Sequence, residues 1–259
     1  MKIKLYQVDA FASKVFEGNP AAVCPLESWL ADDTLQSIAA ENNLSETAFF
    51  VPTGDSYQIR WFAPTREVEL CGHATLASAY VLFYVMNHQK DSVQFESKSG
   101  LLSVRCDGDR LSMDFPAQPP QSCEIPEVIK QAFDATPVEI LKAEDYIVVY
   151  KTEQEVRHAS PVIELLKQLD LRGVAITAKG VHHDFVCRFF APKYGINEDP
   201  VTGSAFTQLI PYWSTVLGKS ELNARQVSQR GGEVQCTMNG RRVTISGKAK
   251  LYLEGTIDI

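Results

Sequence analysis

A five-residue pattern that occurs twice in the chain constrains the fold more than any other feature of the sequence. Arg60-Trp-Phe-Ala-Pro64 recurs as Arg188-Phe-Phe-Ala-Pro192, at an offset of 128 residues. Each copy leads through a glycine, Gly72 or Gly203, into an apolar stretch that is typical of a buried helix. The repeat therefore predicts two similar halves, each with a strand, a turn and a helix N-terminus. If the two helix N-termini face one another, the functional site lies between them.

A second pair of similar segments supports this duplication. Residues 100–113 match residues 232–245 at an offset of 132. Both segments carry a hairpin signal between alternating strands, Asp107-Gly108 in the first and Asn239-Gly240 in the second. Two independent matches are a stronger indication of duplication than either match alone.

The division into domains follows from the repeats and from a proline-rich connection. Four prolines between positions 116 and 126 are typical of a linker. We therefore expect one repeat domain over residues 1–116 and a second over residues 117–248. The last strand, over residues 249–259, is expected to return to the sheet of the first domain.

Local signals predict three features of the helices. Asp33 is expected to cap a helix over residues 34–42. The segment from Gly72 to Met86 is almost entirely apolar, which predicts a helix buried on every side. Pro211 is expected to kink or divide a helix over residues 203–217.

Composition excludes several classes of function. With 25 basic and 32 acidic residues the chain has a net charge of −7, which argues against nucleic-acid binding. The longest apolar run, Ala74 to Met86, is shorter than the ~20 residues that cross a membrane. The N-terminus alternates polar and apolar residues as a strand does, unlike a signal peptide. The six scattered cysteines suggest reduced thiols, so we expect a cytoplasmic protein. We expect no membrane partner.

A carboxylate breaks the symmetry between the halves. Carried over the 128-residue offset, Glu46 falls opposite Val174. Glu46 precedes an apolar strand with two phenylalanines, Phe49 and Phe50. It is either a solvated acid at a strand end or a general acid/base tuned by partial burial.

The two predicted helix starts offer polar groups to a ligand. Gly72-His73 aligns with Gly203-Ser204, and free backbone N–H groups at a helix start favour an anion. The alternative is that His73, Thr202 and Ser204 simply cap their helices. Asp199 is either a turn acid or a group that orients His73 and relays a proton.

Other chemistries find less support in the sequence. Cys71-x-His73 has no second pair with ligand spacing, so a metal site is not expected. A racemase with two thiols would need a cysteine at the second helix start, and none lies between Cys187 and Cys236. A hydrolase triad of Ser204, His73 and Asp199 lacks the G-x-S-x-G elbow.

Four motifs resemble the PhzF-like family of phenazine-biosynthesis proteins and span most of the chain. They are Val8-Asp-Ala-Phe11 with Gly18-Asn19-Pro20, Asn43-Leu-Ser-Glu46-Thr-Ala-Phe49, Cys71-Gly-His-Ala-Thr75 and Glu198-Asp-Pro-Val-Thr-Gly-Ser-Ala205. The resemblance implies an α+β, diaminopimelate-epimerase-like fold, with two similar domains that each wrap a mostly antiparallel, barrel-like sheet around a central helix. It also implies an active site in the cleft between the domains and an isomerase that shifts a proton without a cofactor, usually as a homodimer.

The resemblance also implies roles for individual residues. In such a protein Glu46 is the general acid/base, and His73, Asp199 and Ser204 contact a small carboxylate-bearing substrate. The complete expected site has no metal and consists of catalytic Glu46, His73 and Asp199 with substrate-binding Asn19, Gly72, Ala74, Thr202, Gly203 and Ser204. Two alternatives stay open: an epimerase of the same fold that uses Cys71, and a non-catalytic protein that binds a small molecule.

Overall fold

The computed structural model describes all residues from Met1 to Ile259. The chain forms two compact units. Unit 1 comprises Met1–Asp114 together with Ser246–Ile259, and unit 2 comprises Phe115–Ile245. The sequence had suggested boundaries at 116/117 and 248/249, within three residues of these.

Unit 1 is built mainly of strands. Its strands are β1 (Lys2–Ala10), β2 (Asn19–Pro25), β3 (Glu46–Thr53), β4 (Ser56–Ala63), β5 (Arg66–Val68), β6 (Ser92–Ser97), β7 (Gly100–Asp107), β8 (Arg110–Pro116, which ends just past the unit) and β18 (Ala249–Asp258). Its helices are α1 (Asp32–Asn42), α2 (Gly72–Tyr80) and a short π-helix, η1 (Val81–Val85).

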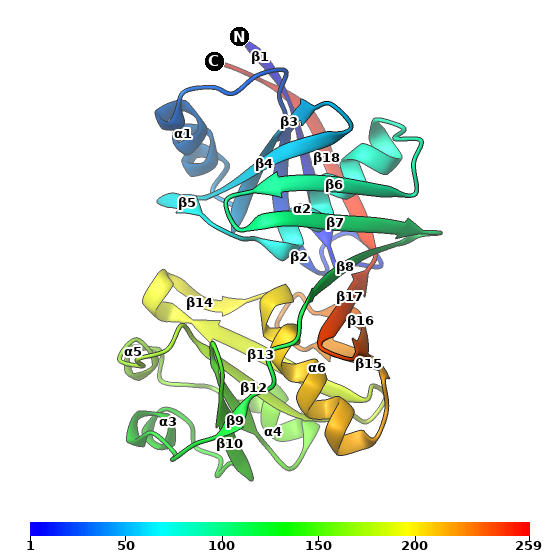
Figure 1. The fold of residues 1–259 in the computed structure, drawn as a ribbon. Helices are drawn as coiled ribbons and strands as arrows, with labels where there is room; N and C mark the ends of the chain where they lie inside the picture. Colours follow the sequence, from blue (N-terminus) through cyan, green and yellow to red (C-terminus); the bar gives the residue numbers. More distant parts are fainter. The chain divides into compact units, whose positions relative to one another are not determined.

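The strands of unit 1 pair in the order β18-β1-β2-β3-β4-β6-β7-β8, with β5 also on β4. The pairs β2–β3 and β4–β6 are parallel and the others are antiparallel. Figure 1 shows β1 in blue and β18 in red side by side, although they come from opposite ends of the chain. Helix α2 contacts β18, β1, β2 and β3 but also β7. The sheet therefore curves around α2.

Strand β3 shows how the sheet is covered on both faces. Alternate residues of a strand point to opposite faces. Phe49 and Val51 pack with Leu35 and Ile38 of α1 in one apolar cluster. Phe50 points to the other face and meets Phe95 of β6 edge to face, with ring centroids 6.3 Å apart. Because both faces are covered, β3 is buried from its first residue to Val51, and its start can hold a buried side chain.

Unit 2 consists of the remaining elements. Its strands are β9 (Gln121–Ser122), β10 (Glu139–Lys142), β11 (Tyr146–Val149), β12 (Val174–Lys179), β13 (Phe185–Ala191), β14 (Ile196–Asp199), β15 (Glu221–Gln226), β16 (Gly232–Asn239) and β17 (Arg242–Gly247, which ends just past the unit). Its helices are α3 (Glu127–Ala132), α4 (Glu153–His158), α5 (Ile163–Leu166), the 3₁₀ turn η2 (Pro192–Tyr194) and α6 (Gly203–Leu217).

Unit 2 repeats the pairing pattern of unit 1. Its order is β9-β10-β11-β12-β13-β15-β16-β17, with β14 also on β13. As in unit 1, the parallel pairs are the third and fifth pairs of the order, here β11–β12 and β13–β15. Glu46 and Val174 are each the first residue of the fourth strand of this pattern, β3 and β12, as the sequence offset predicts.

Three predictions about the helices were wrong or incomplete. Helix α1 starts at Asp32, and its N-cap is Ala31 with no side-chain cap, so Asp33 lies inside the first turn. The apolar segment after Gly72 is buried along most of α2 and as far as Leu82 of η1, whereas Tyr84 and Met86 beyond it are exposed. Pro211 does not divide α6, which runs unbroken through it. No helix has the length and apolar character that crossing a bilayer requires.

Candidate active site

The unit 1 cluster is formed by four side chains, Asn19, Glu46, Cys71 and His73. Asn19 is the first residue of β2 and Glu46 the first of β3, and these strands run parallel with Ala21 opposite Glu46. Parallel strands begin at the same edge of a sheet, so both side chains lie there. His73 is the second residue of α2, and Cys71 is its N-cap.

The imidazole of His73 contacts the other three side chains. Its Nε2 lies 3.2 Å from Oε2 of Glu46. Its Nδ1 lies 3.3 Å from Nδ2 of Asn19 and 3.5 Å from Sγ of Cys71. All four side chains are buried, with His73 6% and Glu46 9% exposed. The fold thus brings together residues that are 54 positions apart in the sequence.

The hydrogen bonds of Asn19 assign the tautomer of His73. Ser45 donates its hydroxyl to Oδ1 of Asn19 at 3.3 Å, so the amide nitrogen of Asn19 faces the imidazole and donates to Nδ1. The ring hydrogen of neutral His73 therefore sits on Nε2, the nitrogen beside Glu46. That N–H has no aligned hydrogen-bond partner although it is buried. It is poised to donate to Glu46 or to a bound molecule.

Burial keeps His73 uncharged. Removal from solvent lowers the pKa of His73 to about 3, because the charged imidazolium loses its hydration. His73 is therefore a neutral hydrogen-bond donor at physiological pH.

The N-terminus of α2 adds backbone donors to the cluster. No side chain caps this helix. The carbonyl oxygen of Cys71 instead accepts from the backbone N–H and the hydroxyl of Thr75. The first intrahelical hydrogen bond is donated by Thr75, so the backbone N–H groups of Gly72 and Ala74 in the first turn have no partner within the helix. An uncapped first turn carries the positive end of the helix dipole and suits an anion.

The same cluster contains three potential metal donors. Donor atoms of Glu46, Cys71 and His73 lie within 4.8 Å of one another, a grouping that the sequence analysis missed because Glu46 is distant in sequence. One ion binds one nitrogen of an imidazole. Here Cys71 approaches Nδ1 and Glu46 approaches Nε2, on different sides of the ring. The arrangement fits a hydrogen-bonded acid/base cluster better than a metal centre.

A second cluster lies in unit 2, where β14 leads into α6. Asp199 ends β14 and is 9% exposed, and Thr202 is the N-cap residue of α6. The hydroxyl of Thr202 donates to Oδ2 of Asp199 at 2.6 Å. Gln226, at the end of β15, hydrogen-bonds to both residues. Sequence reasoning missed Gln226, since a glutamine at a strand end carries no motif.

Helix α6 also begins without a side-chain cap. The sequence alternative in which Thr202 caps this helix is wrong, because its hydroxyl is turned to Asp199. Gly203 is buried and Ser204 is half-buried in the first turn. The expected binding residues of the second half therefore surround an open helix N-terminus.

One turn further along α6 lies a buried charged network that the sequence did not reveal. Asp145 has no exposed surface and accepts from Nε of Arg172 at 2.9 Å and from Nε2 of Gln208 at 2.7 Å. The positive charge of Arg172 also acts on Asp199. This network fixes α6 against the strands that precede it.

The cysteines of unit 2 offer no thiolate at the start of α6. Burial raises the pKa of Cys187 and of Cys236, so both stay protonated at neutral pH. Cys187 lies behind Gln226, with its Sγ 4.0 Å from Oε1 of that residue.

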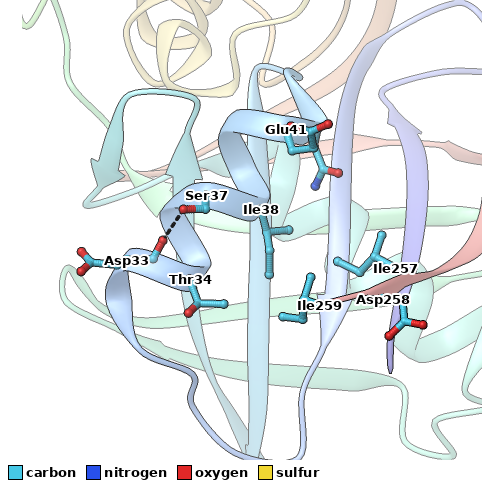
Figure 2. Close-up of a pocket in the computed structure, with 9 residues that line it drawn as sticks. Asp33, Thr34, Ser37, Ile38, Glu41, Ile257, Asp258 and Ile259 are labelled. Atoms are coloured by element: carbon cyan, nitrogen blue, oxygen red, sulfur yellow. Dashed lines mark hydrogen bonds between the residues drawn. The ribbon is translucent and has the colours of Figure 1, made fainter. Parts of the chain in front are cut away.

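A cavity of about 640 Å³ lies elsewhere in unit 1. It is bounded by α1 and the end of the chain, where Ile38 lies beside Ile257 and Ile259 (Figure 2). Asp33 and Glu41 add carboxylates to its rim. None of the site residues expected from the sequence lines this cavity.

Comparisons with known proteins agree on the family. A profile of the phenazine biosynthesis-like protein family matches residues 8–255. An uncharacterized isomerase from Pseudomonas aeruginosa is 51% identical over 259 residues, with 100% of both chains covered. The crystal structure of a phenazine biosynthesis protein of the PhzF family from Enterococcus faecalis has a TM-score of 0.98 and 46% identity, again over 100% of both chains.

A more distant structure supports the fold alone. A protein from Pseudomonas aeruginosa described as a predicted epimerase is 19% identical, with a TM-score of 0.73 and coverage of 98% of this chain and 99% of that one. The resemblance carried by the four motifs and the expected α+β fold are thus confirmed. The chain belongs to the phenazine biosynthesis-like, or PhzF, family and is an isomerase of that family.

Proposed function

We propose that this isomerase moves a proton within a small carboxylate-bearing molecule, without a cofactor, and that Glu46 is its general acid/base. The observation that carries the proposal is the pair formed by Glu46 and His73. Oε2 of the buried Glu46 lies 3.2 Å from Nε2 of an imidazole that burial keeps neutral, beside an uncapped helix N-terminus.

The proposed reaction uses these groups in sequence. Glu46 takes a proton from a carbon next to a carbonyl or carboxyl group, and the electron pair moves onto the oxygen of that group. The Nε2–H of His73 and the backbone N–H groups at Gly72 and Ala74 stabilise the developing oxyanion. Glu46 then returns the same proton to another carbon of the system, so no net proton or electron is lost.

Asn19 and Ser45 support the reaction through His73. Asn19 donates to Nδ1, which holds the ring hydrogen on Nε2, and Ser45 holds the amide of Asn19 in the orientation that this requires. In the opposite tautomer Nε2 would present a lone pair to the oxyanion and repel it.

The unit 2 cluster is assigned to substrate binding. Asp199 and Thr202 form a buried hydrogen-bonded pair that can contact polar groups of the substrate. The open first turn of α6, with Gly203 and Ser204, suits a carboxylate. Formation of a homodimer, which the family resemblance implies, and a cytoplasmic location stay predictions.

A second candidate is an epimerase that uses Cys71. Its Sγ lies 3.5 Å from Nδ1 of His73, so a thiol is present at the cluster. The hydrogen bond from Asn19 to the same nitrogen favours the isomerase, because it occupies the lone pair that would accept the thiol proton. A third candidate is a binding protein that does not turn over its ligand.

One set of variants tests the proposal and separates these candidates. Small carboxylic acids are screened by thermal shift, and each hit is assayed for conversion by the wild type, Glu46→Gln, Cys71→Ala and the control Glu41→Gln at an exposed position on α1. The proposal predicts loss of at least ~10²-fold in turnover for Glu46→Gln alone. Full activity of Glu46→Gln would overturn it, and loss in Cys71→Ala would favour the epimerase. A hit that no form converts would favour the binding protein.

A further inference from the structure

The side chain of Gln226 hydrogen-bonds to the segment that joins β14 to α6. The residue has no exposed surface. Its Oε1 accepts from the backbone N–H of Thr202 at 2.9 Å, and its Nε2 donates to the backbone oxygen of Asp199 at 2.6 Å. Nε2 also lies 3.3 Å from Oγ1 of Thr202, as a donor to the hydroxyl. Both ends of the amide therefore hold the two residues of the unit 2 cluster.

The hydroxyl of Thr202 has one hydrogen, and its direction decides what the hydroxyl can do. It receives a hydrogen bond from Gln226 and gives its own hydrogen to Oδ2 of Asp199 at 2.6 Å. A threonine at an N-cap position normally turns its oxygen to the backbone N–H of the second or third helical residue. Thr202 has the extended backbone of such a cap, with φ −111° and ψ 92°, yet makes no cap bond.

From these contacts we infer that Gln226 is a positioning residue that keeps the N-terminus of α6 open for an anionic group of the substrate. It does so by holding the Thr202 hydroxyl on Asp199, away from the backbone N–H of Ser204, whereas the N–H of Ala205 already donates to the carbonyl oxygen of Thr202. The inference rests on the proposed binding role of the unit 2 cluster. It adds a residue that none of the family motifs contains.

The chemistry of an amide explains why glutamine suits this position. A leucine or methionine of similar length would give Thr202 neither a donor nor an acceptor. The hydroxyl would then be held by Asp199 alone, and its rotation towards the helix would cap α6 and compete with an anion for the Ser204 N–H.

Hydrogen exchange measured by NMR tests the inference without any substrate. In Gln226→Leu the new cap is expected to slow exchange of the Ser204 amide about 5-fold, as a typical N-cap bond would. Adding Thr202→Val removes the oxygen that forms the cap, so the double variant should lose the slowing. Simple destabilisation would speed exchange, so the sign of the change separates positioning from a purely structural role.

Two further variants complete the experiment. Gln235→Leu, at an exposed position on β16, is the matched control and should leave the Ser204 amide unchanged. Gln226→Met is the substitute if Gln226→Leu does not fold. Unchanged or faster exchange at Ser204 in a folded Gln226 variant would overturn the inference. That result would leave the role of Glu46 untouched, because turnover by Glu46→Gln is measured separately.

Discussion

The buried, neutral state of His73 makes the stability of the protein depend on pH in a defined way. The pKa of His73 is about 3 in the folded protein, against ~6.5 in an unfolded chain. As the pH falls below ~6.5, the unfolded chain binds a proton that the folded protein does not accept. The contribution of this residue to stability is therefore fully present above pH ~6.5 and is lost as the pH falls towards 3.

The substitution that isolates this effect is His73→Asn, because an asparagine oxygen can still accept from Asn19 but cannot be protonated. Each pH unit between the two pKa values is worth ~1.4 kcal/mol, so between pH 6.5 and 4.5 the wild type loses ~2.7 kcal/mol that the variant keeps. The free energy of unfolding in urea, measured from pH 7 to 4.5, gives this difference directly.

His158→Asn, at an exposed position on α4, is the control for loss of a histidine in general. The stability difference between wild type and His73→Asn should change by ~2.7 kcal/mol over this pH range. If that difference stays constant with pH, His73 is not held neutral by burial, and the reasoning about its role as a neutral donor fails.

Three further substitutions test separate parts of the account. Arg172→Leu leaves the charge of Asp145 buried and unpaired, which should cost ~3–5 kcal/mol in urea unfolding. Gly18→Ala should cost roughly 3 kcal/mol or more, because a Cβ there would overlap a backbone oxygen, whereas Gly240→Ala, with a similar positive φ but open space, should cost ~1 kcal/mol. Cys71→Ala should retain turnover on any substrate that the isomerase converts.

Each of these expectations has a clear contrary result. A loss below ~1 kcal/mol in Arg172→Leu would mean that the network around α6 is solvated and weak. Equal losses at Gly18 and Gly240 would mean that backbone conformation alone, and not close approach, sets the cost. A Cys71→Ala variant that is folded but inactive would mean that the thiol of Cys71 takes part in the proton transfer.

The duplicated pattern predicted the architecture because local chemistry is enough to specify it. Alternating strands and glycine turns such as Asn239-Gly240 fix short-range pairing, and the same pattern placed Glu46 and Val174 at matching strand starts. Helix ends were predicted less well. Asp33 has the chemistry of a cap, but the chain enters α1 two residues earlier, so its side chain does not reach a cap position.

The sequence predicted the site residues that belong to motifs. It missed the residues and hydrogen bonds that depend on tertiary contacts. Glu46 and His73 stand in motifs, but the hydrogen bond from Asn19 that sets the tautomer of His73 depends on where β2 and α2 meet. Gln226 belongs to no motif and reaches Thr202 only through the pairing of β13 with β15. The spacing of cysteines and histidines argued against a set of metal donors near Cys71. Such spacing cannot show that Glu46, 25 positions earlier, folds beside Cys71.

The central claim, that Glu46 carries the proton within the substrate, is tested most directly in heavy water. With a converted substrate in hand, NMR of the product shows whether solvent deuterium enters at carbon. Because Glu46 returns the substrate's own proton, the account predicts less than one deuterium per product molecule at the carbon that receives the proton in the wild type, and at least ~10²-fold slower conversion with Glu46→Gln. Conversion and exchange at the wild-type rate in Glu46→Gln would contradict it.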